Sequence, residues 1–209
     1  MAKRGYFITF EGPEGSGKTT QSKMLYEALL AKEYQAYMTR EPGGLPEAEA
    51  IRGILKDTEN KGYDLTDRAE LYLFSAARNM FVSKVVIPRI NEGINVISDR
   101  FADSTRAYQG YAGGIEMKLI ERMIAESTEG VSPDLTFIID VDPAVGLSKE
   151  TEGGRFSMKS LAYHQKVRNG YLDIAAKNPK RCVVFPRIEG EMQQTHEKIM
   201  QAVHERLGL

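Results

Sequence analysis

Residues 12–19 of the sequence read Gly-Pro-Glu-Gly-Ser-Gly-Lys-Thr, which matches the phosphate-binding pattern G-x-x-x-x-G-K-[ST]. In such a loop, glycines let backbone N–H groups surround phosphate oxygens, and the following helix N-terminus adds partial positive charge. The lysine can reach the terminal phosphates, and the last hydroxyl can bind Mg²⁺. We therefore expect a nucleoside triphosphate on the following residues: Gly12, Pro13, Glu14, Gly15, Ser16, Gly17, Lys18, Thr19 and Thr20.

Two further clusters suit a second phosphorylated ligand. Arg40 begins the string Arg-Glu-Pro-Gly-Gly, and its planar guanidinium could clamp a phosphate, although a plain Pro-Gly turn is the alternative. Asp99 and Arg100 directly follow the apolar run 94–98. Asp99 is placed to organise Mg²⁺, and Arg100 to lie between donor and acceptor phosphates, where charge must be stabilised during phosphoryl transfer. The alternative is a surface ion pair.

Phe74 and Arg78 form a third pair. They lie four residues apart in an expected helix and so share one face. A ring can stack on a base while a guanidinium donates to a base carbonyl. Phe74 also belongs to an apolar stripe with Ala77, Phe81 and Val85, and the pattern by itself favours a core position.

The elements that must position these residues alternate between strand and helix. Apolar runs predict strands at 6–10, 35–39, 95–98, 135–141 and 182–185. Helical periodicity predicts helices between them, including 67–90 and 191–207. This alternation is typical of an α/β fold with a parallel sheet, and 209 residues suit a single domain.

Composition and charge indicate which binding partners and which cellular compartment to expect. A net charge of −1 provides no basic field for nucleic acid or an anionic membrane, and no apolar run approaches membrane-spanning length. We expect neither partner. The single Cys182 lies in an apolar run, which favours a buried thiol. With no secretory segment expected before the first strand, we expect a cytoplasmic protein. No Cys/His cluster indicates a structural metal site.

Taken together and in order, these strings resemble the bacterial thymidylate kinase family of P-loop nucleoside monophosphate kinases. The resemblance covers nearly the whole chain. It rests on residues 10–21, on 40–44, on Asp-Arg-Phe at 99–101 leading to 104–110, on Pro-Asp-Leu-Thr at 133–136 and on Asp-Val-Asp at 140–142. It implies a three-layer P-loop NTPase fold with five parallel strands, helices on both faces and a short lid at about 149–158.

The resemblance also implies roles in transfer from ATP, with Mg²⁺, to dTMP. Lys18, Arg100, Arg155 and Glu14 would be catalytic, and Thr19 and Asp99 would hold the metal. Phe74 would stack on thymine and Arg78 would contact a thymine carbonyl, so the resemblance moves Phe74 from core to site. The implied dTMP site comprises Arg40, Phe74, Arg78, Arg100, Ser104, Thr105, Tyr108 and Gln109. Within it, Tyr108 would pack against the deoxyribose, while Glu14 would approach the 3′-hydroxyl.

The sequence departs from the family pattern mainly in the lid. Family members carry a catalytic arginine in the phosphate loop or in the lid, and this loop has none. Arg155 is the only arginine in the expected lid, and Gly154 and Ser157 replace the carboxylates of the family's Asp-Arg-x-Glu signature. Either Arg155, helped by Lys149, does the work of several arginines, or turnover is slow. Phe101 replaces a tyrosine.

Several alternatives stay open at this point. The acceptor could be another nucleotide or a deoxynucleoside, although Arg40 and Arg100 favour an acceptor that already bears a phosphate. A nucleotide switch or binding protein is a different class. A guanine-nucleotide switch usually reads its base with an Asn-Lys-x-Asp string. The nearest string here, at 60–64, has its Asp one position too late, which argues against a switch. The family implies a homodimer. The stripe with Phe81 and Val85 is a candidate surface, unless it packs on the sheet.

Overall fold

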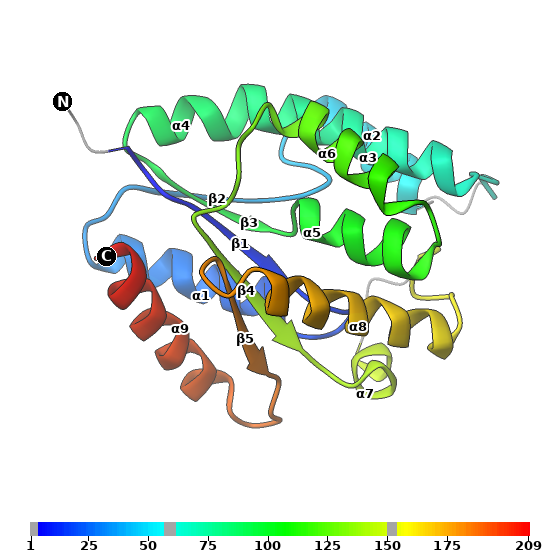
Figure 1. Ribbon diagram of the computed structural model, residues 1–209. Coiled ribbons are helices and arrows are strands. Elements are labelled where there is room, and N and C mark those ends of the chain that lie inside the picture. Colours follow the sequence, from blue (N-terminus) through cyan, green and yellow to red (C-terminus); the bar gives the residue numbers. More distant parts are fainter. Residues whose placement is uncertain (1–3, 57–61, 150–153) are drawn as a thin grey trace.

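A computed structural model describes residues 4–56, 62–149 and 154–209 of the chain. Within them, one parallel sheet has the strand order β2-β3-β1-β4-β5 (Figure 1). The strands are β1 (Phe7–Glu11), β2 (Ala36–Arg40), β3 (Asn95–Asp99), β4 (Leu135–Asp140) and β5 (Cys182–Pro186). These bounds confirm the predicted strands, with shifts of at most one residue at each end.

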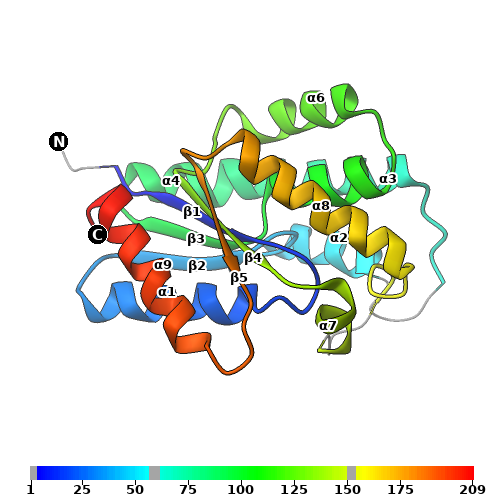
Figure 2. The same cartoon turned by 60° about the horizontal axis from the view of Figure 1, so that its bottom comes forward.

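Helices cover both faces of the sheet, as predicted. The helices α1 and α9 lie together on one face, and α3, α4, α6 and α8 lie on the other (Figures 1 and 2). The helical segments are α1 (Lys18–Ala31), α2 (Pro46–Lys56), α3 (Asp67–Phe81), η1 (Val82–Val86), α4 (Ile87–Asn91), α5 (Ala102–Thr105), η2 (Arg106–Ala112), α6 (Met117–Thr128), α7 (Pro143–Ser148), α8 (Leu161–Lys177) and α9 (Met192–Leu207).

The strand β1 shows how the sequence builds two cores. Successive side chains of a strand point to opposite faces. Ile8 and Phe10 pack with α1 and α9, whereas Phe7 packs with α3, η1 and α6 on the other face. Thr9 and Glu11 share the face of Phe7, and both are completely buried. Two polar side chains thus lie inside the layer that carries the site.

The predicted helix at 67–90 is observed as the continuous run α3, η1 and α4, and it ends at Asn91. The Thr66 hydroxyl caps its start by accepting a 3.2 Å hydrogen bond from the Ala69 N–H. The middle segment η1 is π-helical and changes the rotation of the residues around it. Among the described helices, none has the length and apolar character that a membrane span needs.

Register at the carboxyl ends of the strands brings the predicted loops together. Arg40 lies beside Asp99 in the pairing of β2 with β3, and Phe10 lies beside Asp99 in the pairing of β1 with β3. In open α/β sheets, ligands bind beyond these carboxyl ends. The phosphate loop, the Arg40 loop and the Asp99 turn therefore meet at one edge.

Candidate active site

The phosphate loop needs its glycines because other backbone passes close to it. A Cβ atom at Gly15 would lie 1.9 Å from the Gly146 carbonyl oxygen, and one at Gly12 would lie 2.3 Å from that of Ile139. Both residues also have positive φ angles, +63° and +138° respectively. The loop ends at Gly17, which caps α1 without a side-chain hydrogen bond, so the first backbone N–H groups of α1 are open to an anion.

Lys18 is buried against this loop. Its ammonium group donates to the Pro13 carbonyl at 2.8 Å and to the Ser16 hydroxyl at 3.4 Å. Burial, and next the charge of Arg100, lower the pKa of Lys18 to about 8. The charges of Glu14, Asp99 and Glu11 act to raise this pKa but do not outweigh burial, so a phosphate that approached Lys18 would further favour the charged ammonium.

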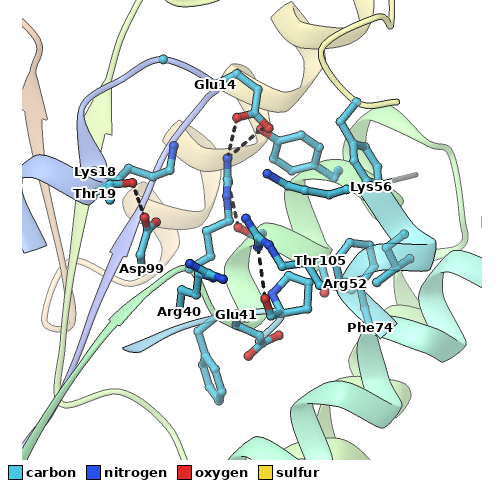
Figure 3. Close-up of a pocket in the computed structure, with 18 of the residues that line it drawn as sticks. Glu14, Lys18, Thr19, Arg40, Glu41, Arg52, Lys56, Phe74, Asp99 and Thr105 are labelled. Carbon is cyan, nitrogen blue, oxygen red and sulfur yellow. Dashed lines mark hydrogen bonds and ion pairs between the residues drawn. The ribbon is translucent and has the colours of Figure 1, made fainter. Parts of the chain in front are cut away.

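A cavity of about 460 Å³ opens in front of this loop (Figure 3). Lys18, Thr19 and Asp99 lie at one end, Phe74 and Thr105 at the other. Among the described residues, its cationic lining side chains are Lys18, Arg40, Arg52, Lys56, Arg78, Arg100, Lys149 and Arg187. The described carboxylates that oppose these cations are Glu14, Glu41 and Asp99. This excess of positive charge suits highly anionic ligands.

The cavity brings most of the predicted site residues together. Those that line it are Glu14, Gly15, Gly17, Lys18, Thr19, Thr20, Arg40, Phe74, Arg78, Asp99, Arg100, Ser104, Thr105, Tyr108 and Gln109. The remaining predicted residues do not line it: Gly12, Pro13, Ser16 and Arg155. Gly12, Pro13 and Ser16 nevertheless contact the site, because their oxygen atoms accept hydrogen bonds from Arg100 or Lys18.

Thr19 and Asp99 contact each other directly. The Thr19 hydroxyl donates a hydrogen bond to Asp99 Oδ2. Asp99 Oδ1 is buried and has no hydrogen-bond partner among the described residues. Mg²⁺ prefers oxygen ligands and commonly takes one or two carboxylates together with phosphate oxygens. A hydroxyl and an unsatisfied carboxylate oxygen beside the phosphate loop fit that requirement.

Arg100 is held at the centre of the site. Its guanidinium donates to the Gly12 carbonyl at 3.2 Å, the Ser104 hydroxyl at 3.1 Å and the Tyr171 hydroxyl at 3.0 Å. It also lies 3.1 Å from the Glu14 carboxylate. Burial acts to raise the pKa of Glu14, but the charge of Arg100 and then that of Lys18 outweigh it and lower this pKa to about 2.

Arg78 is almost completely buried at the far end of the cavity, with 1% of its surface exposed. One nitrogen lies 2.5 Å from the Glu41 carboxylate and donates to the Thr105 hydroxyl at 2.7 Å. Its Nε and Nη1 atoms have no hydrogen-bond partner among the residues that the structure describes. Unpaired buried donors are costly, so this arginine is suited to an acceptor on a ligand.

Phe74 does not pack in the core with the rest of its predicted apolar stripe. It is half-buried and lines the cavity, with its ring centroid 6.0 Å from that of Phe156. Ala77, Phe81 and Val85 are buried in the protein interior instead. The proposal that Phe81 and Val85 form a dimer surface is therefore wrong. Their stripe packs on the sheet, which was the stated alternative.

The expected lid, 149–158, is only partly described, since 150–153 lie outside the described residues. Arg155 donates a 2.8 Å hydrogen bond to Glu70 at the start of α3. Lys149 lines the cavity and contacts Glu189 at 2.7 Å. The two cations that were expected to share the work of the lid are thus paired with different carboxylates.

Several charged residues that line the cavity were not predicted from the sequence: Glu41, Arg52, Lys56 and Arg187. Glu41, the buried partner of Arg78, lies inside the Arg-Glu-Pro-Gly-Gly string, but only Arg40 was assigned a role there. Arg187 follows β5, lines the cavity and donates to the Gly15 carbonyl of the phosphate loop. Its position beyond the carboxyl end of a strand is the signal that could have identified it.

The arrangement can join two phosphorylated ligands. One end of the cavity offers a phosphate loop, a lysine and oxygen ligands for a metal ion. The other end offers an aromatic ring beside a buried arginine, two of whose donors have no partner in the part of the chain that the structure describes. Arg40 and Arg100 also line the cavity, and their guanidinium groups could bind phosphate. Positioning and charge stabilisation of this kind are the main requirements for phosphoryl transfer, which needs no covalent enzyme intermediate.

Comparison with known proteins gives one consistent result. The family model described as "Thymidylate kinase" matches residues 10–199. The thymidylate kinase of Citrifermentans bemidjiense is 44% identical, over 97% of this chain and 93% of its own length. That of Afipia carboxidovorans is 42% identical, over 98% of this chain and 91% of its own length. The crystal structure of thymidylate kinase from Ehrlichia chaffeensis superposes with a TM-score of 0.78 at 37% identity, covering 96% of this chain and 99% of that one.

Proposed function

Because the chain belongs to the thymidylate kinase family, we propose that it transfers the γ-phosphoryl group of ATP to dTMP, giving ADP and dTDP. The observation that carries the choice of acceptor is Arg78. It is buried beside Phe74, in the same cavity as Lys18 of the phosphate loop, and two of its nitrogen atoms have no hydrogen-bond partner among the described residues. A pyrimidine carbonyl would satisfy such a donor while the ring stacked on Phe74.

Charge neutralisation is the first task of the site. Two highly anionic phosphate groups must approach in line, and their repulsion opposes the reaction. Lys18 would bind the terminal phosphates of ATP, and Arg40 and Arg100 would hold the phosphate of dTMP. Arg40 lies 3.1 Å from Glu49 and Arg100 lies 3.1 Å from Glu14, so both guanidinium groups are oriented before the substrates bind.

Recognition of the nucleoside is the second task. Thr105 accepts a hydrogen bond from Arg78, and Gln109 is buried in the cavity wall, so both would lie near the base. Tyr108 would pack against the deoxyribose. Its hydroxyl donates to Glu14 at 3.2 Å, which supports a role for Glu14 next to the sugar hydroxyl.

We propose that Thr19 and Asp99 hold the Mg²⁺ that accompanies ATP. The Oδ1 atom of Asp99, which has no hydrogen-bond partner among the residues that the structure describes, supports this assignment. When bound, the ion would neutralise charge on the phosphate oxygens. Arg155 is the arginine that we propose to stabilise the transferring group, supported by its being the only arginine of the expected lid.

Assembly and location are further parts of the proposal. The family resemblance supports a homodimer, which sedimentation would test. Cys182 is a free, buried thiol whose pKa is raised to about 11 by burial, which supports a structural rather than a redox role. With nucleotides as substrates, we propose a cytoplasmic location.

Direct product detection tests the proposed function. The protein would be incubated with ATP, Mg²⁺ and, separately, dTMP, dUMP, dCMP, dGMP, UMP and thymidine, with chromatography of the products. We expect strong preference for dTMP. Preference for another acceptor would contradict the assignment of the base site. ATP binding without transfer to any acceptor would contradict the kinase assignment and favour a nucleotide-binding protein.

A further inference from the structure

Glu11 is a fully buried carboxylate at the last position of β1 that has no role in the site as described so far. It points to the same face of the sheet as Thr9, because it lies two residues further along the strand. Burying a carboxylate is unfavourable unless hydrogen bonds or charges compensate for lost hydration. Its partners therefore indicate what the position requires.

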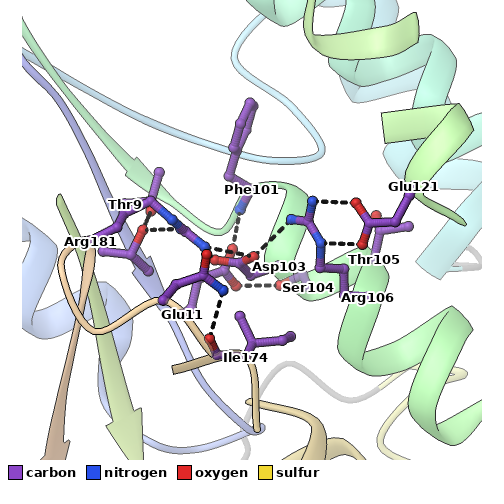
Figure 4. Close-up of polar contacts among 12 residues, drawn as sticks. Thr9, Glu11, Phe101, Asp103, Ser104, Thr105, Arg106, Glu121, Ile174 and Arg181 are labelled. Atoms are coloured by element: carbon purple, nitrogen blue, oxygen red, sulfur yellow. Dashed lines mark hydrogen bonds and ion pairs between the residues drawn. The ribbon is translucent and has the colours of Figure 1, made fainter. Parts of the chain in front are cut away.

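Its hydrogen-bond partners among the described residues lie on the segment that follows Arg100, through the start of α5, and on α8. Figure 4 shows Phe101 and Ser104 beside Glu11. The Phe101 N–H donates to Glu11 Oε1 at 2.8 Å, and the Ser104 hydroxyl donates to Oε2 at 2.6 Å. The Tyr171 hydroxyl of α8 donates to Oε2 at 3.2 Å. Three donors thus converge on one carboxylate from two separate segments of the chain, 101–104 and α8.

The backbone at Arg100 explains why such support is needed. Arg100 has a φ angle of +74°, in the left-handed region that side chains other than glycine seldom adopt. Such a conformation costs on the order of 1–3 kcal/mol and persists only where surrounding contacts hold it. The Arg100 N–H donates to the Phe10 carbonyl at 2.8 Å, and the next N–H is the one that Glu11 accepts. Consecutive residues of β1 therefore hold the N–H groups on both sides of the strained residue.

The same carboxylate is also linked to the Arg100 side chain. Ser104 and Tyr171 each donate to Glu11, and each accepts a hydrogen bond from the Arg100 guanidinium, at 3.1 Å and 3.0 Å. One residue thus supports both the backbone and, through two hydroxyl groups, the guanidinium.

We propose that Glu11 is a positioning residue for phosphoryl transfer, which holds the strained turn and the guanidinium of Arg100 where the two phosphates meet. The inference rests on the proposed function, in which Arg100 binds the acceptor phosphate. Glu11 does not itself line the cavity. It acts through Arg100, so its loss should affect dTMP and the transfer step more than ATP binding.

The ionisation of Glu11 adds a distinctive readout. Burial, and next the charge of Asp103, raise the pKa of Glu11 to about 7, although Ser104, Arg100 and Phe101 act to lower it. The other titratable groups whose charges interact with it come from α1, α8 and β5: Lys18, Tyr171 and Cys182. The ionised carboxylate accepts from all three donors and offsets the charge of Arg100. The Arg100 turn is therefore held best at higher pH, where Glu11 is ionised.

The test compares wild type with Glu11→Gln, using Thr9→Val as a matched control. Glutamine keeps the shape but places an amide where one carboxylate oxygen accepted hydrogen bonds. Thr9 is equally buried on the same strand face and contacts Thr136 at 2.8 Å, not the Arg100 turn. We expect Glu11→Gln to lower kcat by about 10- to 100-fold and to raise the KM for dTMP, with the Kd for ATP near the wild-type value. Thr9→Val should lower Tm alone.

A pH profile completes the test. Wild-type kcat/KM for dTMP should rise through about pH 7, where Glu11 ionises. The dTMP phosphate also ionises near pH 6, in every variant alike, so the difference between the wild-type and variant profiles is what reports on Glu11. The step near pH 7 should disappear in Glu11→Gln. A Gln variant with wild-type kcat, KM and pH profile would overturn the inference, as would one that changes only Tm, as Thr9→Val does.

Two further results keep this test separate from that of the function itself. Wild-type protein is assayed first, and failure to phosphorylate any acceptor would count against the proposed function rather than against Glu11. If Glu11→Gln does not fold, Tyr171→Phe removes one hydroxyl of the link and should lower kcat and raise the dTMP KM by a smaller factor. Wild-type values for Tyr171→Phe would then overturn the inference.

Discussion

The Arg155 guanidinium lies 2.8 Å from the carboxylate of Glu70, which is itself almost completely buried. Burial raises the pKa of Glu70, and the charge of Arg155 acts against that rise. This ion pair links the described part of the expected lid, at Arg155, to the first turn of α3. In the structure, this arginine therefore neutralises a carboxylate rather than facing the phosphate loop.

Arg155→Ala tests whether this arginine also serves the reaction. If Arg155 stabilises the transferring group, kcat should fall by roughly 100-fold or more, as when a transition-state donor is removed, with little change in ATP affinity. Arg68→Ala, an exposed arginine on α3, is the control and should leave kcat unchanged. Wild-type kcat in Arg155→Ala would show that the Glu70 pair is the only role of Arg155.

Phe74 offers a test of base stacking. Phe74→Ala should raise the KM for dTMP by about 5- to 150-fold, since stacking on an aromatic ring is worth about 1–3 kcal/mol per base. Tyr72→Ala is the matched control, because Tyr72 lies on the same helix and is 50% exposed. Steady-state kinetics with dTMP as the varied substrate would measure both. A fall in Tm with unchanged KM would instead assign Phe74 to the core.

The buried pair of Arg78 and Glu41 separates stability from recognition. Burial raises the pKa of Glu41, while Arg78 acts to lower it. Glu41→Ala leaves Arg78 buried without its counter-charge, and should reduce the free energy of unfolding by about 3–5 kcal/mol. The double variant Glu41→Leu, Arg78→Met should recover much of that stability but bind dTMP poorly. Denaturant unfolding and dTMP titration would check the two effects, and normal dTMP affinity in the double variant would contradict the assignment of Arg78.

Lys18 predicts a pH dependence with a defined sign. Its pKa falls from 10.5 in the unfolded chain to about 8 in the fold, so the folded protein disfavours the charged form. Its contribution to stability is therefore greatest above pH 10.5 and decreases as pH falls to about 8. Below that, it leaves the ligand-free protein roughly 3 kcal/mol less stable.

ATP should reverse this preference, because its phosphates favour the charged lysine. We expect proton uptake on ATP binding above about pH 8 and a weakening of ATP affinity as pH rises further. Calorimetric titration in two buffers of different ionisation enthalpy would measure the uptake. Lys18→Arg should abolish it, and proton uptake that persists in this variant would assign the effect to another group.

Metal removal tests the pair of Thr19 and Asp99. Chelation with EDTA should abolish transfer, and added Mg²⁺ should restore it. Asp99→Asn should raise the Mg²⁺ concentration needed for half-maximal rate, because a carboxylate ligand is replaced by a neutral one. Asp134→Asn is the control. The Asp134 carboxylate lies just before β4 and pairs with Arg4, away from the cavity. An unchanged Mg²⁺ dependence in Asp99→Asn would contradict the assignment.

Local patterns in the sequence determined the elements and the phosphate-binding end of the site. The apolar run at 6–10 and the spacing of the phosphate-loop glycines are properties of short segments, so they can be interpreted without knowing what lies opposite. The α/β class, the five strands and the family followed from such segments and from their order along the chain.

Tertiary structure alone decided which distant residues face one another. The strand order places β1 beside β3 and so brings Glu11 against the Arg100 turn. The packing of α3 beside the sheet and the loops brings Arg78 against Glu41 and Glu70 against Arg155. The position of α3 at the edge of the cavity also divides its apolar stripe. Ala77 and Phe81 face the core, whereas Phe74 faces the cavity. Such pairings depend on how the elements stack, and no local periodicity encodes that stacking.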